Sequence, residues 1–228
     1  MPPVVQSNEA RKLGLENSLF AHLESVDNVI PLTLQYRMNR DIQALANFLT
    51  YDGQLECGTE EVSDRTLHHV GATEDGDSWM SKIVDTRVER SVVFIDTTQL
   101  GAVERNDESG VCNDMEVEIA VRTFDRLRKM STSVEGDKKP SVGVIAPYRA
   151  QVSNLRRSLS KFFDDGFDFG DINTVDQFQG TDRDVIIYSC TRCRPKVGDQ
   201  NGGKERSVDI LSDRRRLNVA VTRAKVHL

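Results

Sequence analysis

Short apolar runs alternate with amphipathic stretches along most of this chain, and this alternation constrains the fold more than any other feature. The runs have the length of buried strands. The expected strands are residues 29–34, 91–96, 141–146, 171–175, 185–190 and 226–228. Strands that alternate with helices predict an α/β fold, in which helices cover both faces of a parallel sheet. Ligands of such sheets bind at the carboxyl ends of the strands.

Four other stretches have the apolar spacing of helices. They are residues 39–50, 113–130, 148–163 and 213–223. Asn39 and Asn113 stand at positions where a side chain can accept hydrogen bonds from the first free amides of a helix. Glu116 and Glu118 fall in the second of these helices, and we expect both carboxylates to face solvent.

Three polar stretches interrupt the pattern. Residues 52–90 form a long Gly- and Asp-rich excursion, residues 131–140 a loop, and residues 193–209 a Gly- and charge-rich stretch that we expect to be mobile.

The net charge of −6 argues against a nucleic-acid partner until its distribution is considered. Residues 192–225 carry ten Lys or Arg against four Asp or Glu, so the rest of the chain is strongly acidic. This asymmetry indicates an anion site towards the carboxyl end, with a solvated basic loop as the alternative.

The sequence also argues against membrane and metal-binding classes. No apolar run approaches the ~20 residues that a spanning helix needs, and the first residues lack the pattern of a secretory signal. The four cysteines are too scattered for a disulfide framework. Cys190 and Cys193 have CxxC spacing without a second pair, so we favour a buried strand cysteine over a metal or redox site.

Two polar segments leave a strand and enter a helix. In the first, Arg37 can reach a phosphate outside the sheet and Tyr36 can stack on a ring. In the second, Pro147 and Tyr148 open a helix whose amino end could cradle a nucleic-acid backbone. The alternatives are a surface arginine beside a half-buried tyrosine, and a proline with a purely architectural role.

Two further segments carry polar or basic residues near the end of the chain. Residues 174–184 crowd Thr, Asp and Gln around Gly180, which permits a close backbone approach or simply a turn. Residues 214–225 place arginines beside a packed helical seam, and a solvated basic helix is the alternative.

Taken together and in order, these segments resemble motifs of superfamily 1 helicases, most closely those of the Upf-like 5′-to-3′ branch. The matching stretches are QYRM at 35–38, TVDQFQG-x-D-x-DVII at 174–187 and RRLNVAVTRAK at 215–225. The resemblance covers about residues 1–55 and 140–228. It implies a RecA-like, P-loop NTPase-type lobe that lacks the P-loop itself, because GxxxxGK[ST] is absent from the sequence.

Residues 49–58 (LTYDGQLECG) narrow the resemblance to the replication nuclease-helicases of Okazaki-fragment maturation. In that family an iron–sulfur nuclease domain precedes the helicase lobes, and the chain contains none of it. The resemblance implies that residues 1–28 are the tail of a first lobe, after motif III. Residues 29–228 would be the second lobe, with a polar insertion at about 58–90 and a truncated last strand. Because Met1 replaces an expected leucine, we expect a partial gene product.

The same resemblance implies roles for individual residues. Arg37 and Arg223 would point at the γ-phosphate of ATP and stabilise charge in the transition state. Tyr36 would pack near the nucleotide, and Gly180 and Asp182 would approach its γ-phosphate and ribose, although the family usually has Glu in place of Asp182. The implied nucleic-acid contacts are Pro147, Tyr148, Thr174 and Gln179.

ATP and Mg²⁺ would then be shared with the missing first lobe, so we expect no hydrolysis or unwinding by this chain alone. The implied partners are single-stranded DNA, the first lobe and a single-strand-binding protein. The implied compartment is the nucleus, with the mitochondrion as a second one. Two alternatives stay open: the lobe of an Upf-like RNA helicase, and a non-catalytic nucleic-acid-binding fragment.

Overall fold

The computed structural model describes residues 5, 7–24, 28–67, 79–107, 110–131, 140–165, 169–193, 211 and 213–228. These residues fall into two compact units, Met1–Leu34 and Gln35–Leu228. The expected loop 131–140 and the stretch 193–209 lie almost entirely outside the described residues. Within the described residues, no helix is long and apolar enough to cross a membrane.

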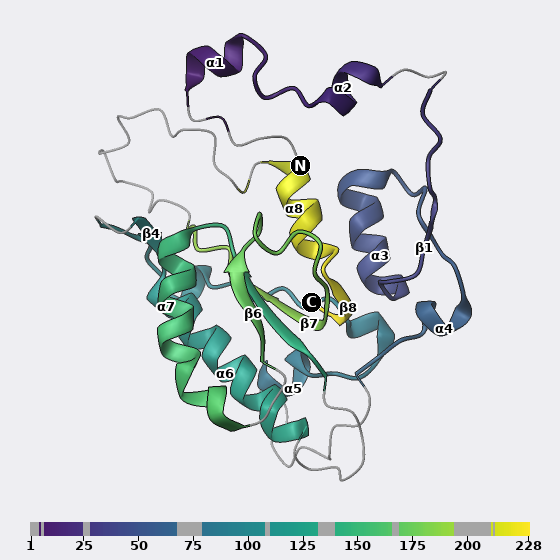
Figure 1. Ribbon diagram of the computed structural model, residues 1–228. Coiled ribbons are helices and arrows are strands. Elements are labelled where there is room, and N and C mark those ends of the chain that lie inside the picture. The colour runs from purple at the N-terminus through teal and green to yellow at the C-terminus, as the bar shows by residue number, and fades with distance from the viewer. Residues whose placement is uncertain are drawn as a thin grey trace. The chain divides into compact units, whose positions relative to one another are not determined.

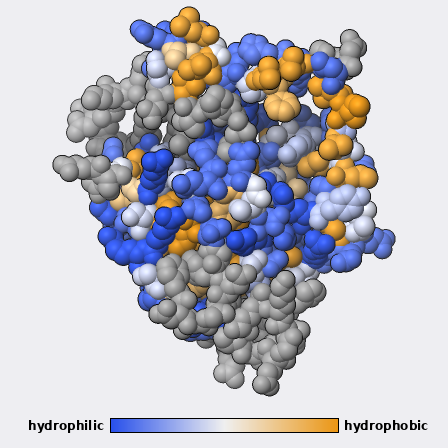
Figure 2. Space-filling view, viewed as in Figure 1, coloured by the Kyte–Doolittle hydropathy of each residue, from blue (hydrophilic) through white to orange (hydrophobic). Residues whose placement is uncertain are grey.

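The first unit contains two short helices, α1 (Asn8–Lys12) and α2 (Leu19–Leu23). Each begins after a serine, Ser7 or Ser18, whose hydroxyl accepts a 3.2 Å hydrogen bond from an amide of the first turn. Large apolar side chains of this unit are exposed, as the orange surface over both helices in Figure 2 shows. They include Leu13, Leu15, Leu19, Phe20, Leu23, Ile30 and Leu32. This unit therefore buries little of its own apolar surface.

The second unit is built on a parallel sheet, as the alternation predicts (Figure 1). Its strands are β5 (Val142–Ala146), β6 (Phe169–Thr174), β7 (Arg183–Tyr188) and β8 (Ala224–His227), in the order β6-β5-β7-β8. All three neighbouring pairs are parallel. The central strand β5 is buried along its whole length, as expected of a strand covered on both faces.

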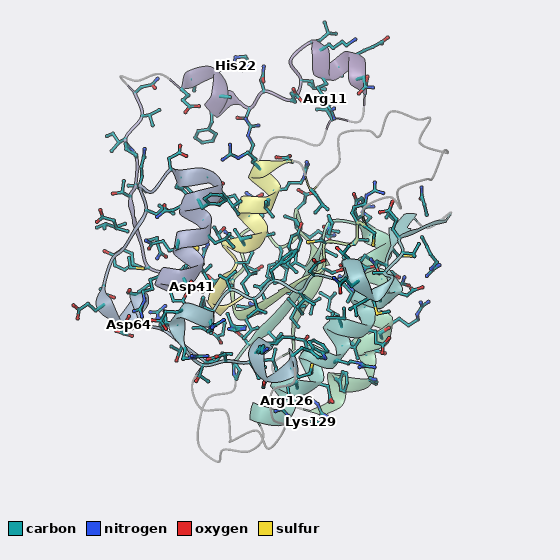
Figure 3. All side chains as sticks on the ribbon, turned by 180° about the vertical axis from the view of Figure 1, so that it is seen from behind. Arg11, His22, Asp41, Asp64, Arg126 and Lys129 are labelled. Atoms are coloured by element: carbon teal, nitrogen blue, oxygen red, sulfur yellow. The ribbon has the colours of Figure 1, made fainter. Side chains whose placement is uncertain are left out.

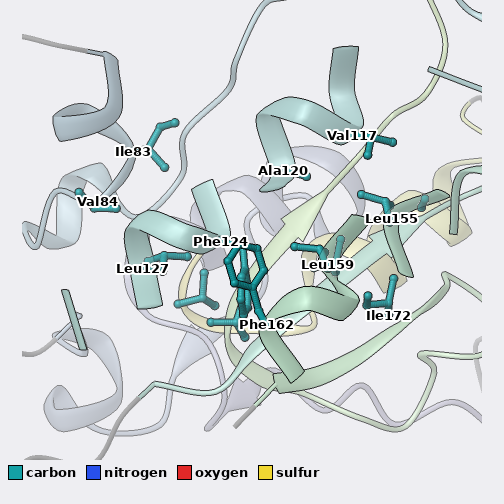
Figure 4. Packing of buried hydrophobic residues seen from close by; sticks show 14 of the residues in the cluster. Ile83, Val84, Val117, Ala120, Phe124, Leu127, Leu155, Leu159, Phe162 and Ile172 are labelled. Carbon is teal, nitrogen blue, oxygen red and sulfur yellow. The ribbon is translucent and has the colours of Figure 1, made fainter. Parts of the chain in front are cut away.

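One face of the sheet packs against α6 (Asp114–Ser131) and α7 (Arg149–Leu159) (Figure 1). Alternate residues of β5, Val142, Val144 and Ala146, enter this core. Figure 4 shows Phe124 at its centre, with its ring centroid 5.5 Å from that of Phe162. The other labelled members of the cluster are Ile83, Val84, Val117, Ala120, Leu127, Leu155, Leu159 and Ile172.

The opposite face packs against α3 (Arg40–Ala46) and α8 (Arg214–Val221). Here Ile145 and Ile186 point from the sheet into a second core that also contains Phe178. Asn39 caps α3 as expected, because its side-chain oxygen accepts from the amide of Ile42 at 3.1 Å. The helix continues as a π-helical turn at Asn47–Tyr51. Helices therefore cover both faces of the sheet, and the expected fold class is confirmed.

The remaining elements are short. They are β1 (Leu34–Gln35), β2 (Glu56–Cys57), α4 (Glu60–Ser63), α5 (Trp79–Ile83), β3 (Arg105–Asp107), β4 (Gly110–Cys112) and 3₁₀ turns at Val88–Arg90, Thr98–Leu100 and Ser160–Asp165. The polar stretch 52–90 therefore contains local helices in its described parts. Residues 68–78 of that stretch lie outside the described residues.

Two expected strands are wrong. In the run 29–34 only Leu34 is a strand residue, and Pro31 has no amide with which to join a ladder. In the run 91–96, Ser91 ends a 3₁₀ turn with helical backbone angles, and no residue of the run is a strand residue. The amide of Val92 donates at 2.9 Å to the carboxylate of Asp41, a residue of α3 that is labelled in Figure 3. Its backbone hydrogen bonds to Leu228 on both sides: the amide of Val93 donates to the carbonyl of Leu228 at 2.9 Å, and the amide of Leu228 donates to the carbonyl of Ser91 at 2.7 Å. Apolar content alone did not show where the ladder partners lie.

Candidate functional site

The amino ends of β7 and β8 bring together two residues that the sequence singled out. Asp182 directly precedes β7 and Arg223 directly precedes β8. Because Arg183 pairs with Ala224, these two residues lie at the same edge, and the amide of Arg183 donates to the carbonyl of Arg223 at 3.0 Å. This is the opposite edge from the carboxyl ends where ligands of parallel sheets were expected.

Arg37 reaches this edge from the segment before α3. Its Nε donates to Oδ2 of Asp182 at 3.1 Å, and its Nη1 donates to the carbonyl of Thr222 at 3.1 Å. Lys225 binds the other carboxylate oxygen, with Nζ 2.7 Å from Oδ1. We call Arg37, Asp182, Arg223 and Lys225 the amino-edge cluster. It contains three cations and one carboxylate.

The start of α3 holds Arg37 in place through Asn39. The backbone amide of Asn39 donates to the carbonyl of Lys225 at 3.0 Å, and its side-chain amide donates to the carbonyl of Val226 at 3.1 Å. Asn39 is fully buried. The same residue therefore caps α3 and ties the segment of Arg37 to β8.

Arg223 is the most deeply placed member of the cluster, with 9% of its surface exposed. Its guanidinium donates to the carbonyls of Val219 and Thr181 and to the hydroxyl of Thr222, at 2.9, 3.2 and 3.1 Å. Burial, and then the charge of Arg37, lower its pKa from the ordinary value. An anion placed between the two arginines would offset both costs.

The carboxylate of Asp182 stays ionised within the cluster. Burial acts to raise its pKa, but the hydrogen bond and charge of Lys225 and then those of Arg37 outweigh burial, and the pKa is lowered. The sequence did not single out Lys225 or the carbonyl of Thr222. The only available signal was their position beside Arg223 in the basic segment.

Two other predicted site residues are close in sequence to members of the cluster: Tyr36 directly precedes Arg37, and Gly180 lies two residues before Asp182. Tyr36 is 60% exposed, and its ring lies so close to Gly58 that a Cβ there would come within 2.2 Å of a ring carbon. Gly58 was not among the predicted site residues. Gly180 has φ +94°, with open space where a Cβ would be, so its turn requires glycine.

Of the four implied nucleic-acid contacts, Pro147 and Tyr148 follow β5, Thr174 ends β6, and Gln179 lies on the turn between β6 and β7. Because Ala146 pairs with Thr174, Pro147 and Tyr148 lie beside Thr174 at the carboxyl edge of the sheet. Pro147 and Thr174 are buried, Tyr148 is half-buried, and Gln179 is exposed. Only Tyr148 and Gln179 thus present a side chain at the surface. We call the carboxyl ends of β5, β6 and β7 the carboxyl edge.

A buried polar network supports this carboxyl edge, and it shows that the solvent-facing prediction for Glu116 is wrong. Its carboxylate accepts from the hydroxyl of Ser189 at 2.6 Å and from the amide of Thr191 at 2.8 Å. Asn113, which caps α6 as expected, and the fully buried Gln151 complete the network. The two hydrogen bonds lower the pKa of Glu116, but burial is the larger effect and raises it above the ordinary value. Glu118 does face solvent, as expected.

The cysteines near this edge are poor nucleophiles. Cys190 lies two residues beyond β7, and burial, followed by the charge of Glu116, raises its pKa to about 11. Within the described parts of the chain, no group of three or more His, Cys, Asp or Glu side chains could hold a metal ion. Cys190 is therefore a partly buried residue just past the strand, whereas we had expected it within the strand.

Comparisons with known proteins show the family of the chain. Residues 15–228 match the family model described as an AAA domain. The chain is 37% identical over 241 residues to the DNA replication ATP-dependent helicase/nuclease DNA2 of Xenopus laevis, which covers 99% of this chain and 21% of that protein. The human and Saccharomyces cerevisiae proteins of the same name are 34% and 33% identical, over 99% and 100% of this chain and 21% and 15% of theirs.

The chain thus spans about a fifth of the length of these relatives. The match extends over both edges of the sheet and over the segment of Arg37. The chain therefore belongs to this AAA domain family, as a helicase domain homologous to part of the DNA replication ATP-dependent helicase/nucleases.

Proposed function

We propose that this chain is the second motor lobe of an ATP-dependent DNA helicase/nuclease of DNA replication and repair. The observation that carries the proposal is the amino-edge cluster, which holds three cations around one carboxylate and leaves Arg223 without a carboxylate of its own among the described residues. Phosphate oxygens of ATP, bound mainly by a first lobe, would complete it.

The proposed chemistry is hydrolysis of the terminal phosphoanhydride. Water attacks the γ-phosphorus, the bond to the ADP oxygen breaks, and negative charge accumulates on the transferred phosphoryl group and the leaving oxygen. Arg37 and Arg223 would neutralise that charge from one side. Asp182 and Lys225 would keep Arg37 oriented until the phosphate arrives.

The carboxyl edge would meanwhile hold the nucleic acid. Tyr148 offers an aromatic face on which a base or sugar can stack, and Gln179 an exposed amide for the backbone. Pro147 and Thr174 would shape the turns that present them. Because Tyr148, Pro147 and Thr174 lie at the opposite end of the strands from the amino-edge cluster, binding of DNA through Tyr148 and hydrolysis of ATP would use different edges of one sheet.

Several partners follow from this proposal. Mg²⁺ would accompany ATP, and because two cations already bind Asp182, its ligands would come from outside the described residues. An iron–sulfur cluster would belong to a nuclease domain beyond this chain. A first helicase lobe and a single-strand-binding protein are the proposed protein partners, and the nucleus, with the mitochondrion second, the proposed compartment.

A chimera tests the proposal. This chain replaces the aligned segment of the Xenopus laevis relative, and DNA-stimulated ATP hydrolysis is measured. We expect turnover that falls at least about 10²-fold in the Arg223→Lys chimera, because a lysine loses the guanidinium fork. Arg122→Lys, on the exposed surface of α6, is the matched control and should hydrolyse ATP normally. A folded chimera in which Arg223→Lys matches that control would refute the proposed role.

The RNA-helicase alternative is tested in the same chimera. Its hydrolysis is stimulated with oligo-dT and with oligo-U at equal concentration. The DNA proposal expects greater stimulation by oligo-dT, and greater stimulation by oligo-U would favour the alternative.

A further inference from the structure

A carboxylate, that of Glu104, is bound to an arginine and a backbone amide at the carboxyl edge. Arg192, which follows β7, donates from Nη1 to Oε1 of Glu104 at 2.9 Å. The backbone amide of Cys193 donates to the other oxygen, Oε2, at 3.2 Å. Glu104 is thus held by one guanidinium and one backbone amide, and neither side chain of the ion pair is fully buried, with 24% of Arg192 and 22% of Glu104 exposed.

The guanidinium of Arg192 is also fixed against Tyr148. Its Nε donates to the phenolic oxygen at 2.9 Å, and its central carbon lies 5.1 Å from the ring centroid. Arg192 therefore has a definite position beside a residue that the proposed function places against nucleic acid. A cation fixed on an aromatic ring needs little further ordering to bind an anion.

The residue before Arg192, Thr191, has a strained backbone that hydrogen bonds hold in place. Thr191 has φ +70°, which is rare for a β-branched residue. The carboxylate of Glu116 accepts from its amide, and the network with Gln151 and Ser189 ties the same segment to α6 and α7. This bracing fixes the direction in which Arg192 and the amide of Cys193 point.

The donors around Glu104 are those that a phosphate prefers. A guanidinium fork and a backbone amide bind phosphate oxygens as readily as carboxylate oxygens. The partial exposure of the pair lets solvent, and hence a competing anion, reach it.

We propose that Glu104 is an internal stand-in for a backbone phosphate, and that a phosphodiester of single-stranded nucleic acid displaces it from Arg192 and the Cys193 amide. The inference rests on the proposed function, because it assumes that nucleic acid lies along the carboxyl edge. It adds a binding site, Arg192 with its neighbouring amide, and a residue that weakens binding, Glu104.

The test uses the 228-residue chain and a fluorescein-labelled dT oligonucleotide, with affinity measured by anisotropy across a salt series. Glu104→Gln should bind about threefold or more tightly than wild type, because the competing charge is gone. Arg192→Ala should bind more weakly, and the slope of log affinity against log salt should shrink by about 0.7, the value for one lost phosphate contact on a single strand. In the Arg192→Ala background, Glu104→Gln should give no gain.

Glu118→Gln is the matched control, because Glu118 also pairs with an arginine but lies on the exposed surface of α6. It corrects for the general effect of removing one negative charge. A Glu104→Gln gain no larger than the Glu118→Gln gain overturns the inference while leaving the proposed function intact. If the folded wild-type chain does not bind the oligonucleotide, the proposed nucleic-acid face fails and the inference fails with it.

A parallel titration with fluorescent ATP distinguishes the source of the phosphate. The inference expects the Glu104→Gln gain with the oligonucleotide and none with ATP. A gain with ATP alone would overturn the assignment to a phosphodiester.

Discussion

The two edges of the sheet handle charge in opposite ways. At the amino edge, Arg37, Arg223 and Lys225 share the single carboxylate of Asp182. At the carboxyl edge, Arg192 has a carboxylate of its own in Glu104, and a second, half-buried carboxylate, that of Glu116, binds Ser189 and the amide of Thr191. The amino-edge cluster thus holds three cations against one carboxylate, and this excess of positive charge suits a polyanion such as a triphosphate. At the carboxyl edge the guanidinium of Arg192 is already paired, so an added phosphate has to compete with Glu104 for it.

The largest effect in the folded chain is expected from Glu116→Ala. The change leaves the hydroxyl of Ser189 and the amide of Thr191 without their buried acceptor and removes the brace on a strained residue. We expect a loss of about 2–3 kcal/mol in the free energy of unfolding, measured by urea titration. Oligo-dT affinity should fall as well.

The same variant tests whether the edges are independent. In the chimera with the Xenopus laevis relative, the KM for ATP at saturating DNA should stay within about twofold of the parent. Glu118→Ala, two residues further along α6 and on its solvent side, is the control and should change neither property. A large rise in KM for ATP would show that the buried network serves both edges.

A smaller effect is expected from Asp182→Glu. The longer side chain is the one that the resemblance to helicases implies at this position, and it can still bind both Arg37 and Lys225. Hydrolysis by the chimera should stay within about threefold of the parent, whereas Asp182→Ala should lower it more, because Arg37 loses its partner. Equal losses in both variants would mean that the length of the side chain matters more than the pair.

The smallest effect is expected in the pH dependence of the free energy of unfolding. The contributions of Asp182 and Glu116 should change with pH in opposite directions. The pKa of Asp182 is lowered in the folded chain, so its contribution is present above its ordinary pKa of about 4 and is lost as the pH falls through the folded value. The pKa of Glu116 is raised, so its contribution is present below its ordinary pKa and is lost as the pH rises through the folded value.

Unfolding free energies of Asp182→Asn and Glu116→Gln, measured from pH 3 to 7, test this difference. Compared with wild type, Asp182→Asn should lose less stability towards pH 3, and Glu116→Gln should lose less towards pH 7. Each difference should stay near or below about 1 kcal/mol, because Asp182 is partly exposed and screened by solvent. If both variants changed the pH dependence of the unfolding free energy in the same direction, the expected difference between the two edges would be contradicted.

Local signals in the sequence were enough for much of the fold. Asn39 and Asn113 cap helices because capping depends on neighbours three residues away. The strands β5, β6, β7 and β8 follow from apolar runs near their expected positions. The prediction of a strand at 91–96 was wrong because the amide of Val92 binds the carboxylate of Asp41, which is distant in the sequence and which no local pattern shows.

Site residues could be predicted from the sequence only where the residue and its motif lie in one short segment. Arg37, Asp182 and Arg223 were named from their segments, and the structure brings them together. Glu104, Gly58 and the burial of Glu116 were missed, because each acts through a contact with a residue far away in the sequence. The pairing of distant charges is a property of the folded chain.

The most direct test of this division of labour is the oligo-dT affinity of Arg37→Ala beside that of Tyr148→Ala, measured by anisotropy in the 228-residue chain without nucleotide. We predict that Tyr148→Ala weakens binding about tenfold through the loss of one stacking platform, while Arg37→Ala leaves it within about twofold of wild type. If Arg37→Ala weakened binding and Tyr148→Ala, still folded by circular dichroism, did not, the assignment of the two edges would be wrong.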